Sequence, residues 1–169
     1  MFDKEVFIRG KHAAYIRSLR DKAKVFERYL DAYILAPIIG FLYGRTAEPD
    51  KSSEDAANIN VVQIISVSDT LKFIYRLIML VDESIAKDPE VRINKAFKDD
   101  TDEEALNENM KIFNSYVLGG LEVLYEKFSE GCVTEDDFLD KVYEFVENFY
   151  ADSCVSPEML KEKVEEYIY

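Results

Sequence analysis

Apolar residues recur at helical spacing along almost the whole chain, and this pattern constrains the fold more than any other feature of the sequence. One stripe alternates intervals of three and four residues: Ile16, Leu19, Ala23, Phe26, Leu30, Tyr33 and Pro37. Such spacing places the side chains on one face of an α-helix, which packs against a neighbour. Further stripes run through residues 61–85, 106–128, 138–149 and 160–167.

These stripes predict an all-α fold, a single-domain bundle of five or six helices within residues 1–169. We expect a basic N-terminal helix over residues 11–44, a polar loop over 45–54 and an acidic helical remainder over 55–169. Six Gly and four Pro are too few for an all-β fold with many tight turns. The β-branched segment 59–67 fits a strand or a helix, and the continuing periodicity favours the helix.

Local signals mark the expected helix ends. Pro37 should kink or break the first helix. Gly44 and Gly131 are expected to end helices, since glycine readily adopts the left-handed conformation found there. The expected helix starts are Ser52 with Asp55, Asp88 with Pro89, Thr101 with Glu104, Thr134 with Asp137, and Ser156 with Pro157.

The segment "AYILAPIIGFLYG", residues 32–44, is apolar on every side. Thirteen residues are too few to cross a bilayer, so the segment is interpreted as a buried core helix. One bundle core covers only part of a helix surface, which predicts self-association. Asp31 and Arg76 each interrupt an apolar run, and we expect each to have an opposite-charge or hydrogen-bonding partner, with the other of the two as one candidate. Such a structural ion pair would fix how the first and second helices align.

Charge is spread unevenly along the chain. Residues 1–45 hold nine Lys/Arg and five Asp/Glu, a net charge of +4, whereas residues 46–169 hold 12 and 29, a net charge of −17; together they give −13. Such asymmetry indicates either a two-faced molecule or two segments that attract each other within the fold. The acidic start "MFDKEVF" and the lack of a long apolar run predict a cytoplasmic protein with no membrane association.

The basic segment predicts a face for an anionic partner. Gly10 is a natural helix start, and Arg20, Lys24 and Arg28 would line one face of the helix at intervals of four. The predicted face comprises Arg9, Lys11, His12, Arg17, Arg20, Lys24 and Arg28. Its partner would be nucleic acid, an acidic protein surface or the acidic part of another copy; the alternative is an ordinary solvated helix.

The sequence shows no familiar catalytic or metal-binding pattern, so we predict no catalytic residues, no cofactor and no metal site. His12 is the only histidine, which excludes a His/Cys zinc cluster. The acid-rich stretch 98–104 fits a solvated loop before a helix, and 129–138 lacks the upstream ligands of a calcium loop. Cys132 and Cys154 flank a predicted helix and would lie too far apart for a disulfide.

These observations favour a non-catalytic protein-interaction subunit or adaptor of a larger cytoplasmic assembly. Its partner would be another protein or a second copy of the chain. The alternative is a nucleic-acid-associated accessory protein that uses the N-terminal basic helix face. Two further hypotheses are an acidic mimic of nucleic acid and an enzyme with a carboxylate site.

Overall fold

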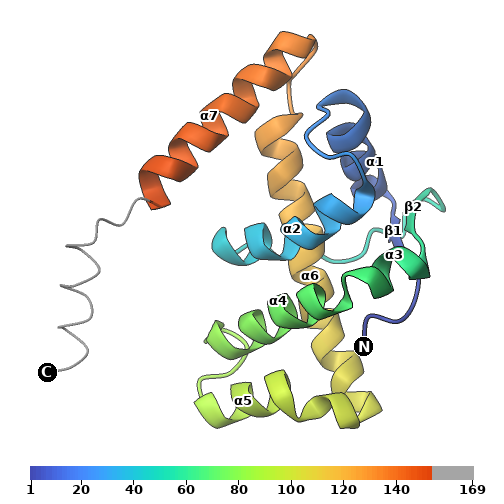
Figure 1. Ribbon diagram of the computed structural model, residues 1–169, viewed down its shortest axis with the longest axis vertical. Coiled ribbons are helices and arrows are strands. Elements are labelled where there is room, and N and C mark those ends of the chain that lie inside the picture. The colour runs from blue at the N-terminus through green and yellow to red at the C-terminus, as the bar shows by residue number, and fades with distance from the viewer. Residues whose placement is uncertain (154–169) are drawn as a thin grey trace, which may run out of the picture.

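The computed structural model describes residues 1–153, which form seven α-helices and one small β-sheet (Figure 1). The predicted all-α class is confirmed. In chain order the elements are β1 (Val6–Arg9), α1 (Lys11–Arg17), α2 (Tyr29–Leu42), β2 (Ala56–Ile59), α3 (Val61–Ser66), α4 (Ser68–Val81), α5 (Pro89–Phe97), α6 (Glu103–Phe128) and α7 (Glu135–Ser153). The helix predicted from Ser156 and the second cysteine, Cys154, lie outside the described residues.

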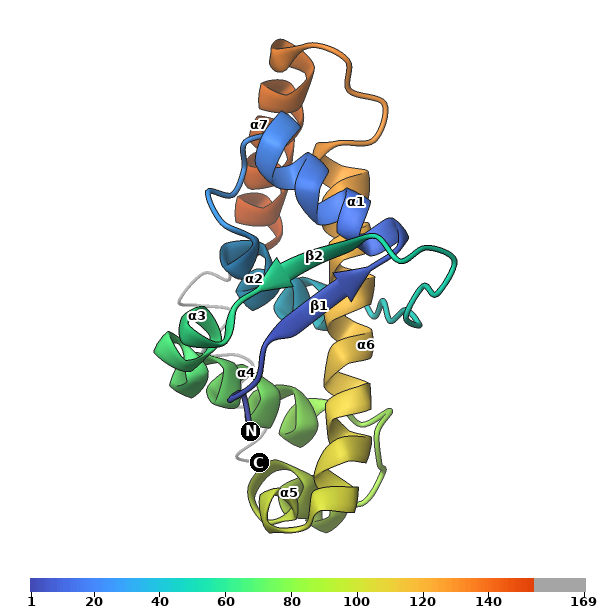
Figure 2. The same cartoon turned by 90° about the vertical axis from the view of Figure 1, so that its right-hand side faces the viewer.

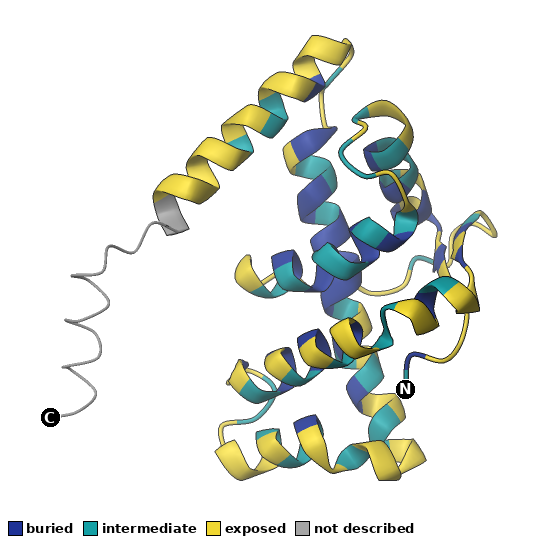
Figure 3. Cartoon of the chain, viewed as in Figure 1, coloured by how far each residue is buried: buried dark blue, intermediate teal, exposed yellow. Residues whose placement is uncertain are grey.

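The long helix α6 is the axis of the fold (Figures 1 and 2). Its 26 residues span about 39 Å. Helices α1 and α2 pack against it, α4 and α5 contact it nearer its start, and α7 leaves its far end at an angle (Figure 1). The middle of α6 is almost entirely buried (Figure 3), which explains the apolar stripe in its sequence.

Helices α2 and α6 cross at backbone contact, and glycine makes this possible. A Cβ atom on Gly120 would overlap the carbonyl oxygen of Ala36, and one on Gly40 would overlap that of Tyr116. A Cβ on Gly119 would overlap the carbonyl oxygen of Arg45, which lies just beyond the end of α2. Any larger residue would therefore force the two backbones apart.

The single helix predicted over residues 11–44 is wrong. Helix α1 ends at Arg17 and widens into a π-helical turn, Ser18–Lys22. Lys24 then adopts a left-handed conformation with φ +52°, and the chain is extended at Arg28 before α2 begins. The predicted alignment of Arg20, Lys24 and Arg28 along one helix face is therefore not formed.

The apolar stripe was nevertheless a good guide to burial. Ile16, Leu19, Leu30 and Tyr33 are all buried, because two short helices and the turn between them each direct their own part of the stripe inward. A local cap fixes the start of α2: the Arg28 backbone N–H donates a hydrogen bond to the Asp31 carboxylate at 3.0 Å. Periodicity alone cannot distinguish one long helix from two that share a face.

Residues 32–44 are covered mostly by the chain itself. Every residue from 32 to 41 is buried or half-buried, and only Leu42 and Tyr43 among the large apolar residues are exposed. The helix continues through the buried Pro37, and Gly44 follows its end with φ +58°, as predicted. This coverage removes the reason for which self-association was predicted.

Within residues 1–153 no helix has the length and apolar character needed to span a bilayer.

The small sheet was missed by the sequence prediction. Strands β1 and β2 pair antiparallel, with Val6 opposite Ile59 and Ile8 opposite Ala57. The sheet lies beside α1 and in front of α6 in Figure 2. In the segment 59–67, Ile59 is the last residue of β2 and Asn60 is extended before α3, so the favoured helix covers Val61–Ser66 and breaks at Val67.

Three of the five helix starts predicted within the described residues are observed. Gly10 is the N-cap of α1. Asp88 with Pro89 begins α5, and Thr134 with Asp137 caps α7. The other two are wrong because a neighbouring residue is the cap. The carboxylate of Asp102, one residue after Thr101, accepts two backbone hydrogen bonds at the start of α6. The Ser52 region precedes a strand, and Asn60 caps α3.

The glycine crossing generates a stability prediction. Replacing Gly120 with Ala should lower the free energy of unfolding by about 1–3 kcal/mol, because the new methyl group requires α2 and α6 to separate. Urea denaturation followed by circular dichroism measures this change. The matched control is Glu108→Ala, an exposed position on the same helix, which should change stability by at most about 0.5 kcal/mol. Equal effects at the two positions would contradict the crossing.

Candidate interaction surfaces

The predicted anionic-partner residues are distributed over β1, α1, the π-helical turn and the loop before α2. Most of them form ion pairs within the chain. Three pairs reach well beyond the basic segment: Lys11 with Glu122 at 2.7 Å, Arg17 with Asp55 at 2.5 Å and Lys24 with Glu135 at 3.0 Å. Two are local: Arg20 with Asp21 and Arg28 with Asp31, each at 2.6 Å.

Arg9 differs from the other cations of this set. Its guanidinium lies over the Phe7 ring at 5.5 Å, and no acidic side chain within residues 1–153 pairs with it. The set therefore does not form one continuous cationic face. An anionic partner for these residues stays a prediction.

His12 is fully buried and belongs to a charged cluster around Glu122. Its Nε2–H donates a hydrogen bond to Glu122 Oε1 at 3.1 Å, and Lys11 Nζ binds the same oxygen. Arg45 lies 3.7 Å from the other oxygen and binds Glu126 at 3.1 Å. The cluster ties α1 and the end of α2 to α6, so its role in the fold is structural.

Burial lowers the pKa of His12, although the hydrogen bond with Glu122 opposes this effect. With Nε2 as the donor, Nδ1 is a lone-pair acceptor, and it has no hydrogen-bond partner among the described residues. A second proton would place a buried donor at Nδ1 with no acceptor in this region. Burial would also raise the pKa of Glu122, but its hydrogen bonds from Lys11 and His12 outweigh burial and lower it.

Asp31 and Arg76 do not pair with each other, so a structural ion pair between the two is not formed. Asp31 accepts from Arg28 at the start of α2. Arg76, on α4, lies 3.7 Å from Asp100 and stacks over Phe97 at 5.5 Å. Each residue does have the charged partner that its place in an apolar run required. These partners do not link α2 with α4, so neither ion pair sets how the two helices align.

Helix α7 carries two apolar stripes, and among the described residues one packs against the body while the other does not. At about 100° per residue, one face of α7 carries Phe138, Val142 and Phe145. Phe138 is buried, and the ring centroids of Phe145 and Phe128 are 4.8 Å apart. The second stripe lies next to the first around the helix. We call it the outward stripe; its members are Leu139, Tyr143, Val146 and Tyr150.

The outward stripe is strongly exposed (Figure 3). Tyr143 is 70% exposed and Tyr150 72% exposed. Sequence reasoning placed Phe138, Val142 and Phe145 inward correctly, but Phe149, also predicted to face inward, is 44% exposed. It missed the outward stripe, although the spacing of four, three and four residues was visible. Isolated exposed apolar residues are normal, whereas these four lie together along one face of one helix.

Acidic residues flank the outward stripe on its far side. Residues 135–153 contain seven Asp/Glu and one Lys, a net charge of −6. Asp136, Asp140, Glu144 and Glu147 fall on neighbouring turns beside the stripe. Helix α7 therefore presents an apolar surface with a negative border.

Two acid-rich stretches were considered as metal sites from the sequence: residues 129–138 at the start of α7, and residues 98–104 before α6. Within residues 1–153 no three His, Cys, Asp or Glu side chains come together as a set of metal ligands. Cys132 is a free thiol in the loop before α7.

A protein-family model described as DNA sulphur modification system-associated protein 4 matches residues 8–152. The chain belongs to this family. The match runs from β1 to the end of α7, so the basic segment, the α2–α6 crossing and α7 are all parts of the family domain. Among curated proteins and among solved structures, no match was found.

The buried histidine generates a pH prediction. The pKa of His12 is lower in the folded chain than in the unfolded chain. As the pH falls below about 6.5, the unfolded chain therefore binds more protons at His12 than the folded chain does. The free energy of unfolding should therefore decrease from pH 8 to pH 5, and His12 should contribute at most about 1.4 kcal/mol per pH unit.

Replacing His12 with Gln keeps a side-chain donor but removes the titration. Urea denaturation at pH 8, 6.5 and 5 should show a smaller decrease for His12→Gln than for the natural protein. The comparison cancels the titration of the acidic residues, which both proteins share. Parallel pH profiles would show that His12 titrates equally in the folded and unfolded states.

Proposed function

We propose that the protein is a non-catalytic accessory subunit of a DNA sulphur modification system, and that it acts in the cytoplasm by binding another protein of that system through α7. The family description supports the association with such a system. The observation that carries the mode of action is the outward stripe, a second apolar face that nothing within residues 1–153 covers.

The chemistry of α7 defines its partner. Tyr143 and Tyr150 supply large apolar area at a low entropic cost, as tyrosines do in protein interfaces. The acidic border would meet Lys or Arg residues around an apolar patch on the partner. A second copy of α7 fits poorly, because its own acids would face Glu144 and Glu147. The partner is therefore a different protein with a basic rim.

The state of the other candidate groups supports a binding role. His12, the only histidine, is buried against Glu122 and thus cannot reach a substrate in this conformation. The cations that could contact nucleic acid are largely engaged: Arg17 binds Asp55 with two nitrogens and also donates to the Ala56 carbonyl. A nucleic-acid role would require these bonds to break, whereas no part of the chain that the structure describes covers the outward stripe of α7.

The decisive experiment measures binding of the full chain to each purified protein of the same organism's DNA sulphur modification system by isothermal titration calorimetry. We expect one component to bind, and the double variant Tyr143→Asp with Val146→Asp to weaken that binding at least tenfold. Both residues are exposed, so circular dichroism should show unchanged helix content.

Phe73→Asp is the matched control, since Phe73 on α4 is 67% exposed and just as apolar. It should bind as the natural protein does. Absence of binding to every component would refute the proposed function. A loss as large for Phe73→Asp as for the α7 variant would move the interface from α7 to α4.

The acidic border adds a second test. Raising NaCl from 50 to 500 mM should weaken binding, chiefly by slowing association, because exposed charges are screened. Replacing Glu144 and Glu147 with Lys should reduce both the affinity and its dependence on salt, as surface plasmon resonance would show. Salt-independent binding would mean that the acids serve only to solvate α7.

A further inference from the structure

The register of the small sheet determines which backbone groups of β1 face away from β2. The Gly10 N–H donates to the Asp55 carbonyl at 3.0 Å, and the Ala56 carbonyl is bound by Arg17 from outside the sheet. Hydrogen-bonded and non-hydrogen-bonded pairs alternate along an antiparallel ladder. Ile8 therefore bonds to β2, whereas Phe7 and Arg9 direct their N–H and C=O groups away from it.

These outward backbone groups form an open edge. Within residues 1–153, neither Phe7 nor Arg9 makes a backbone hydrogen bond outside the β1–β2 ladder. The edge thus offers two donors and two acceptors, at positions two residues apart. An unpaired strand edge of this kind is a template for another extended chain.

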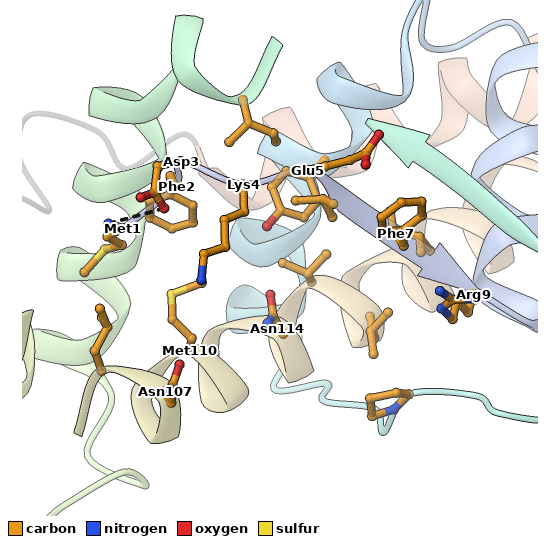
Figure 4. Close-up of a pocket in the computed structure, with 18 of the residues that line it drawn as sticks. Met1, Phe2, Asp3, Lys4, Glu5, Phe7, Arg9, Asn107, Met110 and Asn114 are labelled. Carbon is orange, nitrogen blue, oxygen red and sulfur yellow. Dashed lines mark ion pairs between the residues drawn. The ribbon is translucent and has the colours of Figure 1, made fainter. Parts of the chain in front are cut away.

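The open edge borders a pocket of about 490 Å³. Figure 4 shows β1 along one side of the pocket, with Asn107, Met110 and Asn114 of α6 across from it. Ile8 and Tyr33, both buried, contribute to its apolar lining. The volume lies within the range of pockets that hold small ligands or side chains.

Two cations without an acidic partner among the described residues lie near the two ends of this edge, Lys4 and Arg9 (Figure 4). Most of the acids in the lining are already engaged. Asp3 pairs with the N-terminal amine, Glu5 accepts from Asn58, and Asp50 accepts from the backbone N–H groups of Lys11 and Ser52. Glu103 lies in the first turn of α6, where the helix dipole stabilises its charge.

We propose that this edge and pocket bind an extended peptide from a partner protein, with an apolar side chain next to an acidic residue. The peptide backbone pairs with Phe7 and Arg9 as a third strand. Its apolar side chain enters the pocket, and its carboxylate meets Lys4 or Arg9. This site is separate from α7, so the proposal stands independently of the proposed function.

The test titrates the peptide acetyl-Glu-Val-Thr-Val-Glu-amide into the ¹⁵N-labelled full chain and follows amide hydrogen exchange by NMR. In the free protein the amides of Phe7 and Arg9 should exchange quickly, while that of Ile8 is protected. Bound peptide should slow exchange at Phe7 and Arg9 at least tenfold. No binding at millimolar peptide, or binding without protection at these two amides, would overturn the proposal.

Matched variants separate backbone pairing from side-chain contact. The same peptide N-methylated at both Val residues should bind at least tenfold more weakly. Phe7→Pro removes an edge donor that the β1–β2 ladder does not use and should abolish binding, whereas Phe7→Ala retains the donor and should keep it. Arg9→Glu should weaken binding of the acidic peptide. Equal binding of the methylated and unmethylated peptides would show that no strand is added.

Discussion

The backbone contact between α2 and α6 is the constraint on which the rest of the structure depends. Gly40 and Gly120 allow two helices to approach so closely that carbonyl oxygens occupy the space of the missing side chains. Large residues such as Tyr33, Phe113 and Leu121 then pack without exposure to water. The close approach of the two helices follows from the absence of side chains at the crossing itself.

The same crossing positions the charged cluster. The chain leaving α2 passes over Gly119, which places Arg45 next to Glu122 and Glu126 on the following turns of α6. Lys11 and His12 approach Glu122 from α1. One half-buried carboxylate thus connects three segments, and it does so because the helices beneath it meet at glycine.

The basic segment of this acidic chain is explained largely by attraction within the fold. Lys11, Arg17 and Lys24 bind acids that lie well beyond residue 45. The sequence revealed the charge asymmetry but not the partners of the cations, because Arg17 and Asp55 are 38 residues apart and Lys24 and Glu135 are 111 apart.

Local features were more predictable: the helical class and the caps at Asp88 and Thr134 depend on residues close in sequence. The single helix over 11–44 was wrong because two helices can share one stripe. Strand β1 was missed because four residues paired with a distant segment give almost no periodic signal. The outward stripe of α7 was visible, but only the structure shows that nothing within residues 1–153 covers it.

Gly10 has a consequence for how the N-terminal region can vary in length. It joins a strand, whose side chains alternate every two residues, to a helix that repeats every 3.6. Its φ of +59° and the Asp50 carboxylate in the place of its missing side chain hold this junction in one geometry. The phase of β1 is therefore coupled to that of α1, with Ile8 and His12 both turned inward. Insertion of a single residue between them would exchange the inner and outer sides of the strand. Natural length variation should accordingly fall before β1 or in the loop after α2, and not at this junction.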